Sequence, residues 1–176
     1  MKYITYLAST LCIYFILVNP VMAGENFTME NVNYADTLPN CFELIEPVNG
    51  IIRLSAIKGK GIGPKIQYME EWKAFGWFNE SDRIEWIIEV QKPGKYDIYL
   101  EWSAEGGVIG NPYQLIIGKK MIQRNVKDTG SWEVFDKESI GSLRLKEGLY
   151  RVIIRPDPEI EKGGYFDVRS LELKNR

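Results

Sequence analysis

The chain of 176 residues contains no histidine, and this absence removes several classes of enzyme. A Ser-His-Asp or Cys-His nucleophilic site cannot be built, and no imidazole is available to bind zinc. A general base that works near neutral pH would have to be a carboxylate or a lysine with a shifted pKa. Any catalytic hypothesis for this chain is therefore restricted to those two groups.

Cysteine is also scarce: the chain has only Cys12 and Cys41. Cys12 lies in an apolar N-terminal segment, and Ser9-Thr10-Leu11 before it lack the small residue that precedes a lipidated cysteine. If that segment is removed, Cys41 is left without a partner and no intrachain disulfide can form. An exported protein of this kind depends on its core alone for stability.

Long apolar runs are limited to one, from about Leu7 to Val18, which is shorter than the roughly 20 residues that a membrane span needs. Lys2 precedes this run, and Val21-Met22-Ala23 follow it with the small or apolar residues that signal peptidase recognises. We predict a secretory signal peptide over residues 1–23. A retained membrane anchor is the alternative. The expected location is secreted or periplasmic, with no membrane association after cleavage.

The charge balance shows no surplus of basic residues. Removing the expected signal takes away Lys2 and leaves 21 basic and 24 acidic residues in a chain of 153. No basic patch stands out along the sequence, so nucleic acid is not an expected partner. The length suits one domain with a sizeable core. Residues 24–40 are polar without periodicity and are predicted to be a mobile leader, followed by a single domain over residues 41–176.

No helical periodicity appears after the signal, whereas alternation of apolar and polar residues recurs. It runs through residues 83–90, 95–103, 143–145 and 150–154. Such segments are typical of antiparallel strands with one buried and one solvated face. The residues predicted to face inward are Ile84, Trp86, Ile88, Tyr96, Ile98, Leu100, Trp102, Leu115, Ile117, Leu143, Leu145, Val152 and Ile154.

The residues between these segments have turn chemistry. Pro93-Gly94 fits a type II turn, with a positive φ at the glycine, and Gly118-Lys119 suits a two-residue type II′ hairpin. Lys146-Glu147-Gly148 is expected to form a short hairpin loop. Many short strands with regular turns predict an all-β fold, an antiparallel β-sandwich of the jelly-roll kind with about 8–10 strands and almost no helix.

One tryptophan does not fit the pattern of a core residue. Trp132 follows Asp128-Thr129-Gly130-Ser131, a turn that has no core of its own. An indole left in water forgoes a burial gain of about 2 kcal/mol, so exposure there would suggest a surface for a partner. The alternative is that Trp132 folds back as a lid over the end of the sandwich.

The order of the motifs resembles the galactose-binding-like β-sandwich and, within it, the carbohydrate-binding modules of families 6 and 35. Those domains show a glycine-aromatic pair, a D-x-hydrophobic-E-aromatic strand, a strand opened by Pro-Gly, a Thr-Gly-x-Trp turn and a closing strand. Here the corresponding segments are "FGWF", "DRIEW", "PGKYDIYLEW", "TGSW" and "GGYFDVRSLEL". The resemblance covers about 130 residues, which is nearly all of the chain after the expected signal.

The resemblance implies a sugar-binding cleft among the loops at one end of the sandwich. Trp77 and Trp132 match the two aromatic residues that clamp a sugar ring, and Asp167 falls where the family has an asparagine. The departure matters because an ionised Asp accepts hydrogen bonds and donates none. Tyr113 and Tyr165, which lie near glycines, are further candidates to line the cleft. A flat aromatic ring suits the C–H face of a sugar, and carboxylates suit its hydroxyl rim.

Two further features concern metals and catalysis. Relatives often carry a structural calcium ion, for which Glu43 and Glu46 are candidates, although the sequence has no run of ligands; no other cofactor is expected. Glu70-Glu71 and Glu159 to Glu161 supply carboxylates, but a glycosidase needs two that face each other at a set distance. Nothing in the sequence pairs them.

The sequence therefore predicts a secreted, non-catalytic carbohydrate-binding module. Its ligand would be a polysaccharide or other glycan, and it would act alone or as an accessory to a separate carbohydrate-active enzyme. One alternative is a structural or protein-interaction sandwich without a sugar site. Another is a small hydrolase that uses carboxylates alone.

Overall fold

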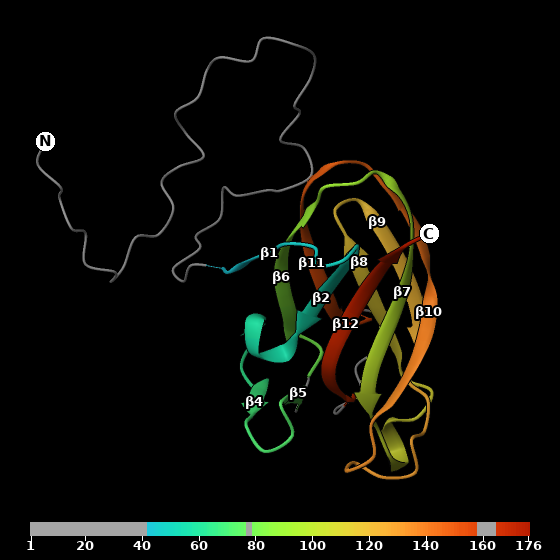
Figure 1. Cartoon of the computed structure of the whole chain (residues 1–176). Coiled ribbons are helices and arrows are strands. Elements are labelled where there is room, and N and C mark those ends of the chain that lie inside the picture. Colours follow the sequence, from blue (N-terminus) through green and yellow to red (C-terminus); the bar gives the residue numbers. More distant parts are fainter. Residues whose placement is uncertain (1–41, 77–78, 158–164) are drawn as a thin grey trace, which may run out of the picture.

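Two β-sheets pack face to face in this protein (Figure 1), whose computed structural model describes residues 42–76, 79–157 and 165–176. Sheet A contains β1 (Leu44–Ile45), β3 (Lys60–Ile62), β6 (Arg83–Val90), β8 (Pro112–Ile117), β9 (Lys120–Asn125) and β11 (Gly148–Pro156). Sheet B contains β2 (Ile51–Ser55), β4 (Gln67–Met69), β5 (Ala74–Gly76), β7 (Gly94–Ser103), β10 (Asp136–Leu145) and β12 (Asp167–Asn175). The helices of the described residues are two 3-10 turns, η2 (Ala56–Lys58) and η3 (Gly106–Val108).

This arrangement confirms the predicted all-β sandwich and refines it. Sheet A has the order β1-β6-β11-β8-β9, with β3 also paired to β6. Sheet B has the order β10-β7-β12-β5-β4, with β2 also paired to β12. Eight of the strands have five residues or more, and β1, β3, β4 and β5 are shorter pieces that the alternation did not reveal. The pairing is antiparallel apart from β1, which runs parallel to β6.

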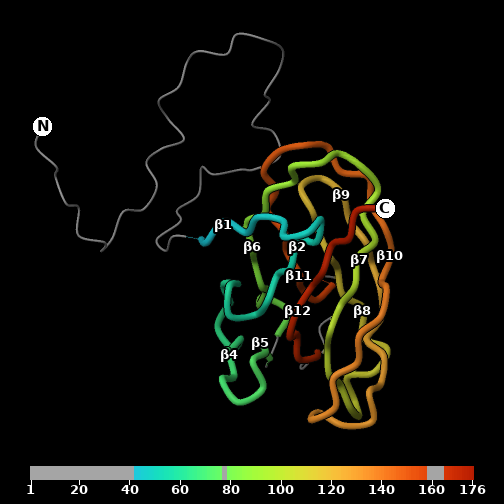
Figure 2. Tube along the Cα trace, viewed as in Figure 1, coloured from blue at the N-terminus to red at the C-terminus, as the bar shows by residue number. Residues whose placement is uncertain are grey.

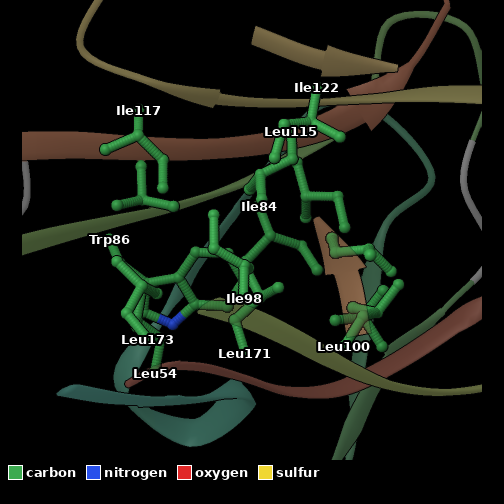
Figure 3. Packing of buried hydrophobic residues seen from close by; sticks show 14 of the residues in the cluster. Leu54, Ile84, Trp86, Ile98, Leu100, Leu115, Ile117, Ile122, Leu171 and Leu173 are labelled. Carbon is green, nitrogen blue, oxygen red and sulfur yellow. The ribbon is translucent and has the colours of Figure 1, made fainter. Parts of the chain in front are cut away.

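The core lies between the sheets and consists of the residues that the alternation selected. Every predicted inward residue is buried except Leu143, which is partly buried and packs against the same cluster. Trp86 is completely buried, and Figure 3 shows it among Leu54, Leu173 and Ile98. Its indole N–H donates a hydrogen bond to the Ser55 carbonyl at 2.9 Å, which satisfies the one polar atom of the ring.

The outward face of β6 differs from the expected solvated face. Glu85 is 0% exposed, although it lies on the polar side of the alternation. The guanidinium of Arg151, on the neighbouring strand, donates to its carboxylate at 2.8 and 2.5 Å, and Arg83 adds a bond at 2.5 Å. A buried carboxylate is tolerated when it is paired in this way, so two arginine side chains explain the difference.

The predicted turns have mixed outcomes. Gly118 has φ +57° in the two-residue connection from β8 to β9, as the hairpin prediction requires. The type II prediction at Pro93-Gly94 is wrong, because Gly94 has no positive φ and instead starts β7 opposite Leu145. A Cβ at Gly94 would lie 2.7 Å from the Asn175 side-chain nitrogen. The glycine is needed for that close approach and not for a turn.

The chain reverses at two ends of the sandwich, which Figure 2 allows the reader to follow. We call one the loop end, formed by residues 79–82, 103–111, 126–135 and 165–167. The other is the turn end, formed by the short connections β6–β7, β8–β9 and β10–β11. None of the helices in the described ranges is long and apolar enough to cross a membrane.

Candidate functional site

The turn before Trp132 is fixed by hydrogen bonds to the end of β7. The Asp128 carboxylate accepts from the Gly130 N–H at 2.8 Å, and Gly130 takes φ +81°. Thr129 donates its backbone N–H to the Ala104 carbonyl at 3.0 Å, and its hydroxyl accepts from the Ala104 N–H at 3.0 Å. Backbone and side chain of one threonine thus attach the turn to the residue that follows β7.

Trp132 stands at the loop end with 38% of its surface exposed. It is the only aromatic residue among the exposed large apolar side chains of the described chain, whereas Trp86 and Trp102 are buried. Trp102 lies just below the turn, and its indole N–H donates to the Lys127 carbonyl at 3.1 Å. The two tryptophans therefore have different surroundings, one in the core and one at the surface.

Asp167 lies at the same end, on the outer face of sheet B. It begins β12 and is paired with Ser103, the last residue of β7, next to the point where the Thr129 turn is attached. A Cβ at Gly76 would lie 2.1 Å from the Asp167 carboxylate oxygen. Gly76 therefore leaves the space that the carboxylate fills.

The surroundings of Asp167 favour its neutral form. Burial raises the pKa of the Asp167 carboxyl from 3.8 to about 6. Near neutral pH this group can accept hydrogen bonds from sugar hydroxyls, and below about pH 6 its protonated form can also donate one.

Two residues that the sequence analysis did not select lie beside Asp167. Ser103 is fully buried, and its hydroxyl has no hydrogen-bond partner within the described part of the chain. The Arg169 guanidinium lies 3.4 Å from the centre of the Phe135 ring and donates to the Trp72 carbonyl at 3.1 Å. A register shift between Val168 and Ser170 places Arg169 irregularly, and no alternation pattern could have revealed it.

The other predicted aromatic residues are located differently. Trp77 lies outside the described residues and directly follows Gly76 in the sequence. Tyr113 is 4% exposed and Tyr165 is 1% exposed, so in this structure neither offers an open ring face to a sugar. Tyr113 packs on Phe166 with ring centres 4.7 Å apart, and burial raises the pKa of both tyrosines above the ordinary value. Their glycine-rich flanks suggested loops, but Tyr113 is the second residue of β8 and belongs to the core.

The carboxylates considered for calcium or catalysis do not gather. Across residues 42–76, 79–157 and 165–176, no group of three or more Asp, Glu, Cys or His side chains lies where a metal ion could be held. Glu43 is paired with Lys58 at 2.7 Å, and calcium binding by Glu43 and Glu46 stays a prediction. Glu159 to Glu161 lie outside the described residues.

Glu70 borders a hollow of about 560 Å³ on the outer face of sheet B. The other carboxylates of that hollow are occupied by cations, since Glu101 pairs with Arg169 at 3.3 Å and Glu172 pairs with Arg53 at 2.8 Å. This hollow therefore does not present the two facing carboxylates that a glycosidase requires.

Comparison with solved structures agrees with this fold. A family 35 carbohydrate-binding module from Clostridium thermocellum is similar over 72% of this chain and 98% of that one, with a TM-score of 0.59 and 15% identity. The C-terminal CBM6 of LamC, a marine laminarinase from Zobellia galactanivorans, is similar over 71% of this chain and 99% of that one, with a TM-score of 0.56 and 15% identity. The chain has the fold of the family 6 and 35 carbohydrate-binding modules.

A third module extends the comparison. The mannan-binding module from Man5C is similar over 70% of this chain and 97% of that one, with a TM-score of 0.55 and 18% identity. No family model and no curated protein matches the sequence. At these identities the likeness concerns the fold, and the binding residues have to be argued from the chain itself.

Proposed function

We propose that this protein is a non-catalytic carbohydrate-binding module that holds a glycan at the loop end. Trp132 stacks on the C–H face of a sugar ring, Trp77 provides the second aromatic surface, and Asp167 accepts hydrogen bonds from hydroxyls. Tyr113 and Tyr165, both buried, support this end from the core. The observation that carries the proposal is a half-exposed indole on a turn that is hydrogen-bonded beside Asp167.

The exposure of Trp132 is energetically unfavourable unless a ligand covers the indole. Exposing Trp132 forgoes a burial gain of about 2 kcal/mol, and the hydrogen bonds of Thr129 keep the turn from folding away. An exposed aromatic surface and a partly buried carboxylate at the same end of the sandwich supply the two groups that a sugar requires. The same proposal includes export with removal of residues 1–23 and action beside a separate enzyme. The LamC module is likewise part of an enzyme.

A glycan array with the purified protein, followed by calorimetry on the hits, tests this function. Trp132→Ala should weaken binding by about 2 kcal/mol, roughly 30-fold in Kd, because aromatic residues at the centre of a binding surface carry much of the energy. The matched control is Val134→Ala, an exposed residue of the same loop, which should leave Kd unchanged. If the parent and Trp132→Ala bind the glycan with equal affinity, Trp132 is a lid on the core and not part of the binding site.

A further inference from the structure

The turn end contains a second hollow, of about 650 Å³, formed where three short connections meet. The β6–β7, β8–β9 and β10–β11 connections supply its walls. Among the described residues that line it, four are basic, namely Lys119, Lys120, Arg144 and Lys146, and none is acidic. These residues come from separate hairpins, so the cluster exists in the fold and is not visible as a basic run in the sequence.

Three of these four charges have no ion-pair partner within the described residues. In the described ranges Lys120, Arg144 and Lys146 form no ion pair, although the chain has 24 acidic residues and only 22 basic ones. Arg144 is also directly opposite Lys95 in the pairing of β10 with β7. Like charges in that position are destabilising. Asp97, the acidic residue near Lys95, is instead hydrogen-bonded to Arg176 at 2.7 Å.

The floor of the hollow is apolar and is held by hydrogen bonds. Ile117, Leu145 and Tyr150 form it, and all three are buried. The Tyr150 hydroxyl accepts from the Lys146 N–H at 3.1 Å, and the Gly118 N–H donates to the Arg151 carbonyl at 3.1 Å. Both walls are therefore tied to β11, so the cations surround a preformed concavity. Its volume lies in the range of ligand pockets, roughly 300–1,000 Å³.

We propose that the turn-end hollow binds an anionic polysaccharide, with its carboxylate or sulfate groups on Lys120, Arg144 and Lys146. A bilayer surface fits less well, because Ile117, Leu145 and Tyr150 of the hollow are buried and cannot enter a membrane. A single nucleic acid strand fits less well too, since base stacking needs an exposed aromatic ring and Tyr150 is buried. The site is distinct from the loop end and lies the length of β7 away from it.

The probes are dextran sulfate and polygalacturonate, with neutral dextran as a blank. The affinity of the protein for each polymer is measured by calorimetry at low salt. The parent protein should bind at least one charged polymer, and affinity should fall as NaCl is raised. The variant Lys120→Gln/Arg144→Gln/Lys146→Gln should bind at least tenfold more weakly. The matched control Lys58→Gln/Lys60→Gln/Lys65→Gln has the same net charge and should stay within twofold of the parent. Trp132→Ala should bind these polymers as the parent does.

Three results would overturn the proposal. One is failure of the parent to bind either charged polymer. Another is an equal loss of affinity in both triple variants, which would mean that the net charge of the protein, and not the hollow, determines binding. The third is tighter binding of the parent to anionic vesicles or to a single-stranded oligonucleotide than to both polymers. Melting curves establish that the variants fold. If the triple variant is unstable, the single change Lys146→Gln replaces it in the test and should weaken binding severalfold.

Discussion

The two ends of the sandwich are built differently from the same strands. At the turn end the connections β6–β7, β8–β9 and β10–β11 are short, so strand pairing alone positions Lys120 and Arg144. At the loop end the connections are long, and side-chain hydrogen bonds such as those of Thr129 hold Trp132 in place. The turn end is thus held by strand pairing and by side chains of the strands, such as Tyr150, whereas the loop end is held by side chains of the loops themselves.

The largest effect is expected from a residue of the core between the ends. Trp102→Ala should reduce the free energy of unfolding by about 3–5 kcal/mol, because it leaves a large cavity and an unpaired Lys127 carbonyl. That loss is a large part of a typical total of roughly 5–15 kcal/mol. Urea unfolding measures it. Trp132→Ala is the matched comparison and should shift the melting temperature by only a few degrees. If both changes reduce the free energy of unfolding equally, the contrast between core and surface tryptophans is wrong.

A smaller but specific effect is expected at the loop end from Gly76→Ala. The added Cβ would lie 2.1 Å from the Asp167 carboxylate and 2.9 Å from the Met69 methyl group, so the carboxylate has to move. We expect a loss of about 1–3 kcal/mol in stability and a clear loss of glycan affinity. Gly107→Ala is the control, since nothing lies within 4 Å of a Cβ there. If Gly76→Ala binds the glycan as the parent does, Asp167 is not part of the glycan-binding site.

The Asp167 carboxyl makes stability depend on pH in a defined direction. Its pKa rises to about 6 on folding from 3.8, so between those values the folded state binds more protons than the unfolded state. Stability should therefore increase as pH falls from about 6 toward 4, by roughly 1–3 kcal/mol, and this contribution is lost above pH 6. Asp167→Asn should remove the dependence and be more stable at pH 7.

The measurement is the difference in unfolding free energy between the parent and Asp167→Asn at several pH values. Taking this difference cancels the contributions that the other carboxyl groups make to the pH dependence. A difference that does not vary between pH 4 and 7 would contradict a raised pKa. The asparagine also restores the residue type expected from the family, so glycan binding at pH 7 should be retained. At the turn end none of the described residues that line the hollow is a carboxylate, so binding of dextran sulfate, whose sulfates stay ionised, should show no such dependence.

The sequence predicted the core and the hairpin at Gly118 well, though not the turn at Pro93-Gly94, because the core and the hairpin depend on local patterns. Alternation selected Ile98 and Leu100, and Gly118 marked a two-residue turn, each without knowledge of distant residues. The exposure of Trp132 followed from the turn before it in the same way. Tyr113 was placed incorrectly, because nothing local distinguishes an aromatic residue in a loop from one in the second position of a strand.

Features that join distant segments could not be predicted. The pairing of Glu85 with Arg151 spans 66 positions, and the contact of Gly76 with Asp167 depends on the order of strands in sheet B. The basic hollow is of the same kind, since Lys120 lies in sheet A and Arg144 in sheet B, and they meet only where the two sheets pack together. These basic residues are far apart along the chain, so the sequence shows no basic patch, and the fold supplies one.

The smallest expected effect tests the turn end by stability alone. Arg144→Gln should raise the free energy of unfolding by about 0.2–1 kcal/mol at low salt, because it removes the like-charge pair with Lys95. The gain should shrink as NaCl approaches 1 M, where the Debye length falls to about 3 Å. Lys58→Gln is the opposite case, since it breaks the ion pair with Glu43 and should be neutral or slightly destabilising. Urea titrations at two salt concentrations distinguish these signs. If Arg144→Gln destabilises the protein at low salt, an anionic group within the chain already balances the cluster, and the hollow is not an open site for an external polyanion.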